Sequence, residues 1–171
     1  MTDDAKLYIG TKTVKATPMT RQAYNDYRGW ALPADEDGAD AGFLVEYLDG
    51  GAANHPHHMG YISWSPADVF ARAYHGVTER MTFGHALVCI KDGERVCRRG
   101  WNGKGMWLSL TQPVPSAYVI HGFGKQFDTT PDEQLPLLPW IGMRTADGKY
   151  VPWLASQTDM LAEDWQLYLP E

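Results

Sequence analysis

Two blocks of the sequence concentrate residue types that bind nucleotides. The first, ERVCRRGWNGKGMW at residues 94–107, joins cationic side chains to an indole, an amide side chain and three glycines. Cations bind phosphate, an indole stacks on a base, and glycines let the backbone approach a ligand closely. The candidate contacts to a phosphate-bearing purine compound are Trp101, Asn102, Gly103 and Lys104, with Arg95, Arg98 and Arg99 as candidate phosphate contacts.

A structural role explains the first block equally well. If its strand alternates, Arg95 and Arg99 share one face while Arg98 points to the other. The three guanidinium groups then cannot all serve one site, and a basic strand followed by a glycine-rich turn needs no ligand. The residues alone leave both interpretations open.

The second block, PWLASQTDMLAEDW at residues 152–165, places a polar run directly before a short helix. Ser156 and Asp159 have the spacing of a capping box with Asp in place of Glu, so helix capping is the favoured explanation. A helix N-terminus also attracts anions, and the Asp159 carboxylate can accept hydrogen bonds from ribose hydroxyls or an adenine amine. The candidate contacts in this block are Trp153, Ser156, Gln157, Thr158 and Asp159.

Other reactive side chains give weaker signals. The HPHH run at residues 55–58 favours a solvated loop over a metal site, because no Cys or suitably spaced carboxylate accompanies it. Two cysteines, Cys89 and Cys97, are too few for a disulfide framework, so we expect reduced thiols. The sequence contains no nucleophile elbow, P-loop, HExxH or paired-carboxylate motif. We therefore expect a binding protein without catalytic residues, metal or cofactor.

Composition excludes several classes of protein. The chain has 171 residues, 44% hydrophobic and 21% charged, which is typical of one folded domain or two small ones. A net charge of -6 argues against a DNA- or RNA-binding protein. No apolar run approaches the roughly 18 residues of a membrane span, and the start of the chain is acidic rather than signal-like. We expect a cytoplasmic protein with no membrane partner.

Three helices are predicted from their capping residues. Thr20 and Gly29 bracket the first helix, with Ala23, Tyr24 and Tyr27 on its inner face. Ser65 is the expected N-cap of the second helix, with Pro66 at its first position. A third helix follows Thr82 and ends at Gly93. Because a new pattern of helix and strand signals begins at Met81, residues 76–80 are the expected boundary between domains 1–78 and 79–171.

The remaining segments are predicted as strands, turns and one short helix. A short helix is expected within residues 156–165, before the final strand, and residues 113–135 are an insertion. The expected strands, in chain order, are residues 6–15, 43–49, 61–64, 94–100, 106–113, 117–120, the two arms of a hairpin over 139–153, and 166–169.

From Met81 onwards the order of motifs resembles the second type of the Thoeris anti-defence family. The resemblance rests on MTFGHAL, GWNGKGM and WLASQTDMLAEDW, and it covers about the second half of the chain. It implies an α+β fold in which a short helix packs on an antiparallel sheet, and a homotetramer with ligand pockets between subunits. Residues 1–78, with YRGW, LVEYLDGG and GYISWSP, resemble a small α+β accessory domain found in phage proteins.

The resemblance also implies a function. Family members are phage proteins of the host cytoplasm that bind glycocyclic ADP-ribose, an immune signal, without cleaving it, and some relatives also bind cyclic di- or trinucleotides. Carried onto this sequence, Trp101 is the adenine-stacking residue and Asn102 a polar contact beside it. Trp153 and residues 156–159 form the opposing wall. This interpretation is favoured over helix capping alone, although the same residues at a helix N-terminus can both cap the helix and bind a ligand.

Two other functions remain open from the sequence. An enzyme that hydrolyses the cyclic nucleotide could use the same residues together with Asp159, Asp164 and the histidines. A phage structural or host-interaction module could reside in residues 1–78, which have helix and strand signals of their own.

Overall fold

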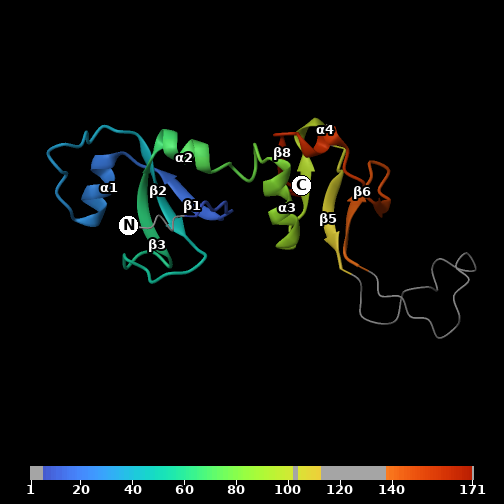
Figure 1. The fold of residues 1–171 in the computed structure, drawn as a ribbon, viewed down its shortest axis with the longest axis horizontal. Coiled ribbons are helices and arrows are strands. Elements are labelled where there is room, and N and C mark those ends of the chain that lie inside the picture. The colour runs from blue at the N-terminus through green and yellow to red at the C-terminus, as the bar shows by residue number, and fades with distance from the viewer. Residues whose placement is uncertain (1–5, 102–103, 113–137, 171) are drawn as a thin grey trace, which may run out of the picture. The chain divides into compact units, whose positions relative to one another are not determined.

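The computed structural model describes residues 6–101, 104–112 and 138–170. The chain divides into two compact units, unit 1 (Met1–His75) and unit 2 (Gly76–Glu171). Each unit combines helices with an antiparallel sheet, which confirms the predicted α+β class (Figure 1). The predicted strand at 117–120 and the insertion at 113–135 lie outside the described residues.

Unit 1 is built on a three-stranded antiparallel sheet. Its strands are β1 (Val14–Pro18), β2 (Gly42–Tyr47) and β3 (Tyr61–Pro66), in the order β1-β2-β3. Two helices accompany them, α1 (Arg21–Arg28) and α2 (Ala67–Ala73). The buried core of this unit includes Tyr24, Leu44 and Ile62, with Trp64 packed against it.

The first helix begins and ends where its caps predict. The Thr20 hydroxyl accepts the backbone N–H of Ala23 at 3.2 Å, and Gly29 ends the helix with a φ of 70°. The predicted inner face is wrong in part. Tyr24 and Asn25 are buried, whereas Ala23 is exposed and Tyr27 is 37% exposed, with its hydroxyl hydrogen-bonded to the His58 ring. A polar helix is thus oriented by its tertiary contacts rather than by its sparse apolar residues.

Two other predictions in unit 1 need correction. The first strand begins at Val14 instead of Lys6, because its pairing partner β2 runs only from Gly42 to Tyr47. Ser65 does not cap α2, whose N-cap is Pro66 without a side-chain hydrogen bond. Ser65 is held in β3 opposite Phe43, so its backbone belongs to the sheet.

Unit 2 contains a five-stranded antiparallel sheet. The strands are β4 (Val96–Arg98), β5 (Trp107–Thr111), β6 (Trp140–Arg144), β7 (Tyr150–Pro152) and β8 (Trp165–Leu167). Their order is β7-β6-β5-β4-β8, so the C-terminal strand pairs with β4. The hairpin predicted within 139–153 is confirmed as β6 and β7, with Gly148 in its turn at a φ of 82°.

Helix α3 (Phe83–Lys91) contacts strands β4, β5 and β8 of this sheet (Figure 1). Thr82 caps it as predicted, and the His85 side chain completes a capping box by accepting the N–H of Thr82. Two short helical elements complete the unit: η1 (Arg99–Trp101) follows β4, and α4 (Gln157–Met160) precedes β8.

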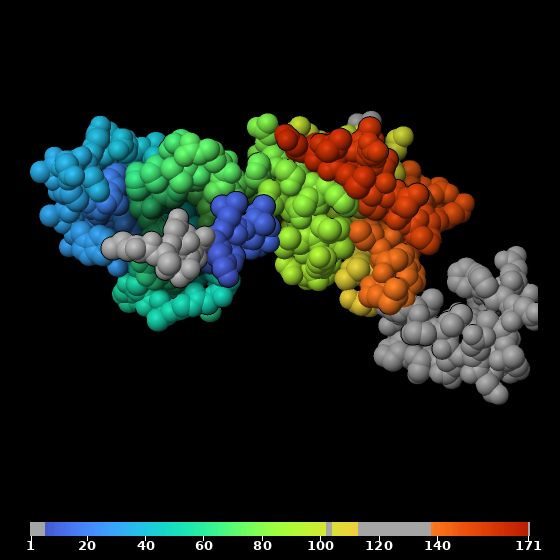
Figure 2. Space-filling view, in the orientation of Figure 1, coloured from blue at the N-terminus to red at the C-terminus, as the bar shows by residue number. Residues whose placement is uncertain are grey.

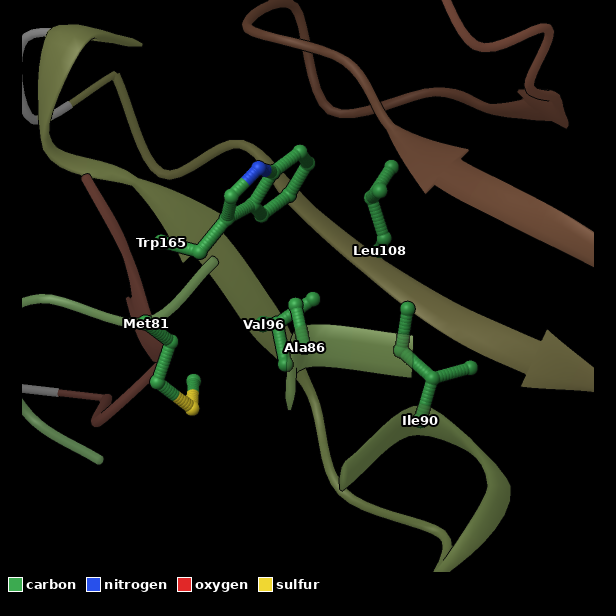
Figure 3. Close-up of a cluster of buried hydrophobic side chains, with 6 residues drawn as sticks. All are labelled: Met81, Ala86, Ile90, Val96, Leu108 and Trp165. Atoms are coloured by element: carbon green, nitrogen blue, oxygen red, sulfur yellow. The ribbon is translucent and has the colours of Figure 1, made fainter. Parts of the chain in front are cut away.

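The core of unit 2 lies between α3 and the sheet. Val96 stands opposite Leu108 and Leu167 in the ladder, so these side chains share one sheet face. The fully buried cluster, drawn in Figure 3, consists of Met81, Ala86, Ile90, Val96, Leu108 and Trp165. In the space-filling view, the orange and red C-terminal segments lie against the yellow-green part of the same unit (Figure 2).

Among the described residues, no helix combines the length and apolar character needed to cross a membrane.

Candidate ligand-binding site

Trp101 closes the short turn η1 and packs against the core. Its ring lies 5.5 Å from the ring of Trp165, measured between centroids, in an edge-to-face arrangement. Trp165 has no exposed surface, whereas Trp101 is half-buried. The Trp101 indole is therefore supported from beneath and keeps part of its surface available to a ligand.

Trp153 contacts the same buried indole from a second segment. Its ring centroid lies 6.1 Å from that of Trp165, again edge-to-face, and 5.8 Å from that of Phe83. The backbone N–H of Trp153 donates to the carbonyl of Ile141, which extends the pairing of β6 and β7. Two half-buried indoles from distant blocks thus share one buried support.

The polar run after Trp153 forms the start of α4. The Ser156 hydroxyl accepts the N–H of Asp159 at 3.1 Å and donates to the Asp159 carboxylate at 2.6 Å. The Thr158 hydroxyl lies 2.8 Å from the same Ser156 oxygen. Capping by Ser156, predicted from the sequence, is confirmed. The exposed side chains of Ser156, Gln157 and Thr158 give this segment a hydroxyl- and amide-rich surface.

Trp165 joins the aromatic and polar parts. Its indole N–H donates to the backbone carbonyl of Asp159 at 3.0 Å. A buried indole N–H needs a hydrogen-bond acceptor, and here the acceptor belongs to α4. The position of α4 is therefore coupled to the core of the unit.

Arg98 connects β4 to both acidic residues of the second block. Its Nε donates to Oδ1 of Asp164 at 2.8 Å, and its Nη1 donates to Oδ1 of Asp159 at 2.8 Å. Oδ2 of Asp164 accepts the backbone N–H of Gly100 at 2.9 Å. The side chains of all three charged residues are at most 22% exposed.

These contacts set the protonation states of the three groups. The hydrogen bond to Asp164 is the largest contribution that raises the pKa of Arg98. Burial alone would raise the pKa of Asp159, but hydrogen bonds from Ser156 and Arg98 outweigh it, so the pKa is lowered. Burial would likewise raise the pKa of Asp164, which the bonds from Arg98 and Gly100 instead lower. All three groups are charged at neutral pH.

The structure separates the other candidate cations. The Arg95 guanidinium lies 4.4 Å from the centroid of the Trp107 ring. Trp107 precedes Leu108 in β5, so its side chain lies on the sheet face away from the core. Arg95 therefore lies on that outer face, whereas Arg98 lies on the core side. Arg99 and Lys104 are exposed at either end of the glycine-rich loop. Asn102 and Gly103 lie outside the described residues.

The loop after Trp101 returns to the sheet through Gly105. This residue has a φ of 63°, which favours glycine, and its carbonyl accepts Nη1 of Arg144 at 2.6 Å. An added Cβ at Gly105 would lie 2.9 Å from the same Arg144 nitrogen. Glycine is therefore favoured here by the backbone conformation, and a side chain would also displace the Arg144 guanidinium from its hydrogen bond.

Unit 1 contains other polar contacts, among them those of His58, whose ring lies 3.2 Å from the Glu46 carboxylate and 3.0 Å from the Tyr27 hydroxyl. Within residues 6–101, 104–112 and 138–170, no group of three or more His, Cys, Asp or Glu side chains is arranged to hold a metal ion. An open hollow of about 400 Å³ in unit 1 is lined by Arg21, Glu36, Asp40 and Trp64. Its Arg21 and Glu36 already form an ion pair, and Arg21 also covers the Trp64 ring.

Sequence reasoning overlooked the residue that organises the site. Trp165 is the contact shared by Trp101, Trp153 and Asp159. Its sequence signal was available, since it is an aromatic residue immediately before the predicted strand 166–169, although the structure begins β8 at Trp165 itself. The pairing of Arg98 with that aspartate had no such signal, because 66 residues separate the two partners.

Comparison with known proteins matches the segment that carries these residues to a described family. Residues 81–168 match the family model of the Thoeris anti-defense 2-like domain. The chain belongs to this family. The match spans both sequence blocks, and it begins at Met81, whose backbone pairs with Trp165 in an isolated β-bridge.

A curated relative agrees with this assignment. Thoeris anti-defense 2 of Bacillus phage SP01 is 40% identical over 89 residues, which are 52% of this chain and 94% of that protein. The family resemblance inferred from GWNGKGM and WLASQTDMLAEDW is confirmed, and membership supports an anti-defence role for this chain.

Proposed function

We propose that this protein binds and sequesters a cyclic nucleotide immune signal, glycocyclic ADP-ribose, without cleaving it. The observation that most supports the proposal is the convergence of the two candidate blocks on Trp165 within the family-matched residues 81–168. Trp101 would stack on the adenine, an interaction worth about 1–3 kcal/mol per base. Trp153 and the hydroxyls and amide of residues 156–158 would contact the ribose and base edges.

Phosphate recognition is proposed for the exposed cations at the glycine-rich loop. Arg99 and Lys104 are exposed, so they can turn towards a ligand without breaking a buried ion pair. Asn102 and Gly103 are proposed as further contacts on the strength of their sequence position between them. Arg95 would contribute only from the opposite face of the sheet.

The chemistry of the site supports a non-catalytic role. The carboxylates of Asp159 and Asp164 are both bound to Arg98, with lowered pKa values, so neither is a proton donor at neutral pH. Catalysis of hydrolysis would need a general base or an activated water, and both carboxylates already accept internal hydrogen bonds. The described groups can therefore hold a ligand more readily than transform it.

The assembly is proposed to be a homotetramer in the host cytoplasm, with the ligand held between subunits. Leu154 and Leu161 flank the polar segment and are 92% and 81% exposed, while Met160 between them is 44% exposed. Large apolar side chains that cluster on a surface typically mark a contact with another molecule. A second copy placed here would cover them and complete the pocket.

Titration calorimetry with glycocyclic ADP-ribose, combined with a turnover assay, tests the proposal. We expect saturable binding with a fixed stoichiometry. We also expect no change in ligand mass at a protein-to-ligand ratio of about 1:100, a ratio at which loss of most of the ligand requires turnover. Loss of ligand under those conditions would instead establish the hydrolase. Absence of binding would direct the same assay to cyclic di- and trinucleotides.

A further inference from the structure

Arg98 is one member of a closed ring of contacts that joins the two segments of the proposed site. From Arg98 the ring runs to Asp164, whose Oδ2 accepts the N–H of Gly100, the residue before Trp101. Trp101 contacts the ring of Trp165, whose indole N–H donates to the backbone carbonyl of Asp159. The Asp159 carboxylate accepts a hydrogen bond from Arg98, which closes the ring of contacts. Each neighbour in this ring fixes the next.

The turn that carries Trp101 depends on Asp164 twice. The backbone carbonyl of Asp164 accepts the N–H of Arg99 at 3.0 Å, and its carboxylate accepts the N–H of Gly100 at 2.9 Å. An added Cβ at Gly100 would lie 3.0 Å from that carboxylate, so the two groups approach closely. The direction of the η1 turn is thus set by one aspartate on another segment.

The geometry of the Arg98 guanidinium is better suited to linking two segments of the chain than to binding a phosphate. Nε and Nη1 of Arg98 each bind a different carboxylate at 2.8 Å, which uses the rigid fork of the side chain in two directions. One cation between two carboxylates leaves this cluster with a net charge of about -1, which repels an approaching phosphate. The side chain of Arg98 is only 20% exposed.

We propose that Arg98 is a positioning residue, which holds Trp101 and α4 in the arrangement that binds ligand, and that it does not contact the ligand phosphates. This assignment rests on the proposed function, because the residues it positions are the proposed ligand contacts. The affinity of the site then depends on the Arg98–Asp164 pair even though neither side chain touches the ligand.

Calorimetry on substituted proteins separates the two roles. We expect Arg98→Gln and Asp164→Asn each to weaken binding of glycocyclic ADP-ribose about tenfold or more, the equivalent of one lost charged hydrogen bond. Arg98→Lys keeps the charge but loses the fork, so it should restore binding only in part. A phosphate contact predicts the opposite for Asp164→Asn, since removing that carboxylate frees Arg98; unchanged or tighter binding there would overturn the proposal.

The matched control is Arg72→Gln, which breaks an exposed ion pair with Asp68 in unit 1. It should leave the affinity unchanged. Ionic strength gives a further distinction, because loss of a phosphate contact flattens the salt dependence of Kd whereas loss of a positioning contact does not. A flatter salt dependence for Arg98→Gln than for the unsubstituted protein would also overturn the proposal.

A measurement on the ligand-free protein tests the positioning role of Arg98 independently of the proposed function. With 5-fluorotryptophan incorporated, the ¹⁹F resonance of Trp101 is assigned by its disappearance in Trp101→Phe. Arg98→Gln and the isosteric Asp164→Asn should each shift or broaden that resonance and leave the Trp64 resonance of unit 1 unchanged. An unmoved Trp101 resonance in the folded Asp164→Asn protein would refute positioning, whereas a shift without any ligand binding would refute only the proposed function.

Discussion

The indole N–H of Trp165 donates to the backbone carbonyl of Asp159 at 3.0 Å, so a fully buried core residue holds the first turn of α4. The same indole is the edge-to-face partner of Trp101 and Trp153. Stability of unit 2 and geometry of the candidate site therefore depend on one side chain. Substitutions at Trp165 should therefore lower both the stability of unit 2 and the affinity for ligand, whereas substitutions at Trp101 should lower mainly the affinity for ligand.

Substitution of Trp165 by alanine should destabilise unit 2 strongly. Loss of a fully buried tryptophan typically costs about 3–5 kcal/mol, and the carbonyl of Asp159 also loses its donor. Urea unfolding followed by hydrogen exchange in β4 and β8 measures the effect. Trp30→Ala in unit 1 is the matched control, since Trp30 is 51% exposed. An equal loss in both variants would contradict the assigned core role.

Substitution of Trp101 by alanine should weaken ligand binding about 5- to 150-fold and leave the proposed oligomer intact. The stacking surface contributes about 1–3 kcal/mol, whereas the half-buried ring contributes less to the core than Trp165 does. Calorimetry measures affinity, and light scattering after size exclusion measures the mass of the assembly. Dissociation or unfolding of the variant would show that Trp101 belongs to an interface or to the core instead.

Much of the fold of unit 2 could be predicted because its elements carry local signals. Thr82 caps α3, and Asp147-Gly148 turns the β6–β7 hairpin. In unit 1, the start of β1 could not be predicted from its own residues, because pairing with β2 decides where a strand begins. Ser65 has the residue type of an N-cap, yet the ladder with β2 holds it in a strand.

The contribution of the Arg98 ion pairs to the stability of unit 2 should be constant from about pH 8 down to 5 and should be lost below about pH 4. Asp159 and Asp164 have lowered pKa values in the folded protein. Their ion pairs with Arg98 therefore stabilise the fold above the pH at which the unfolded carboxyls titrate, and this contribution is lost as the pH falls through the folded pKa values. Thermal unfolding across this range measures it.

The comparison variant for the pH experiment is Asp164→Asn, which removes one of the two titrating carboxyls. Its stability should be lower at neutral pH and should fall less steeply in acid than that of the unsubstituted protein. Identical acid profiles for the two proteins would show that Asp164 does not contribute to the acid transition.

Both thiols should react slowly with iodoacetamide at neutral pH. Burial raises the pKa of Cys89, and the nearby Asp92 and Glu94 raise it further; burial likewise raises the pKa of Cys97. Since only the thiolate reacts, alkylation should accelerate above the ordinary range of thiol titration, with the buried Cys97 slower than Cys89. Mass spectrometry of timed samples measures it, and rapid labelling of Cys97 at pH 7 would contradict the burial.

The candidate site was predictable only where its residues are close in sequence. The run Ser156–Asp159 has a capping spacing that can be recognised without a structure. Arg98, in contrast, could be read as a phosphate contact from the block ERVCRRG, whereas its two acidic partners lie 61 and 66 residues away in the sequence. Long-range ion pairs have no local pattern, so the role of such a cation emerges only from the fold.

Removal of residues 1–75 should leave ligand binding intact. Unit 2 is compact by itself, and the carbonyl of Val77 accepts the N–H of Leu167, so the truncated chain should retain Gly76 and Val77. Calorimetry on the fragment 76–171 measures this. Loss of affinity in a folded fragment would instead assign part of ligand capture to unit 1.

Sequestration of the ligand is most directly tested by its recovery. The purified protein is mixed with glycocyclic ADP-ribose, the free ligand is removed by filtration, and the retained protein is heated to release what it holds. Depletion of the ligand followed by release of a compound of unchanged mass, still able to activate the immune effector, is the predicted result. Depletion with recovery of a cleaved product would contradict sequestration and identify an enzyme.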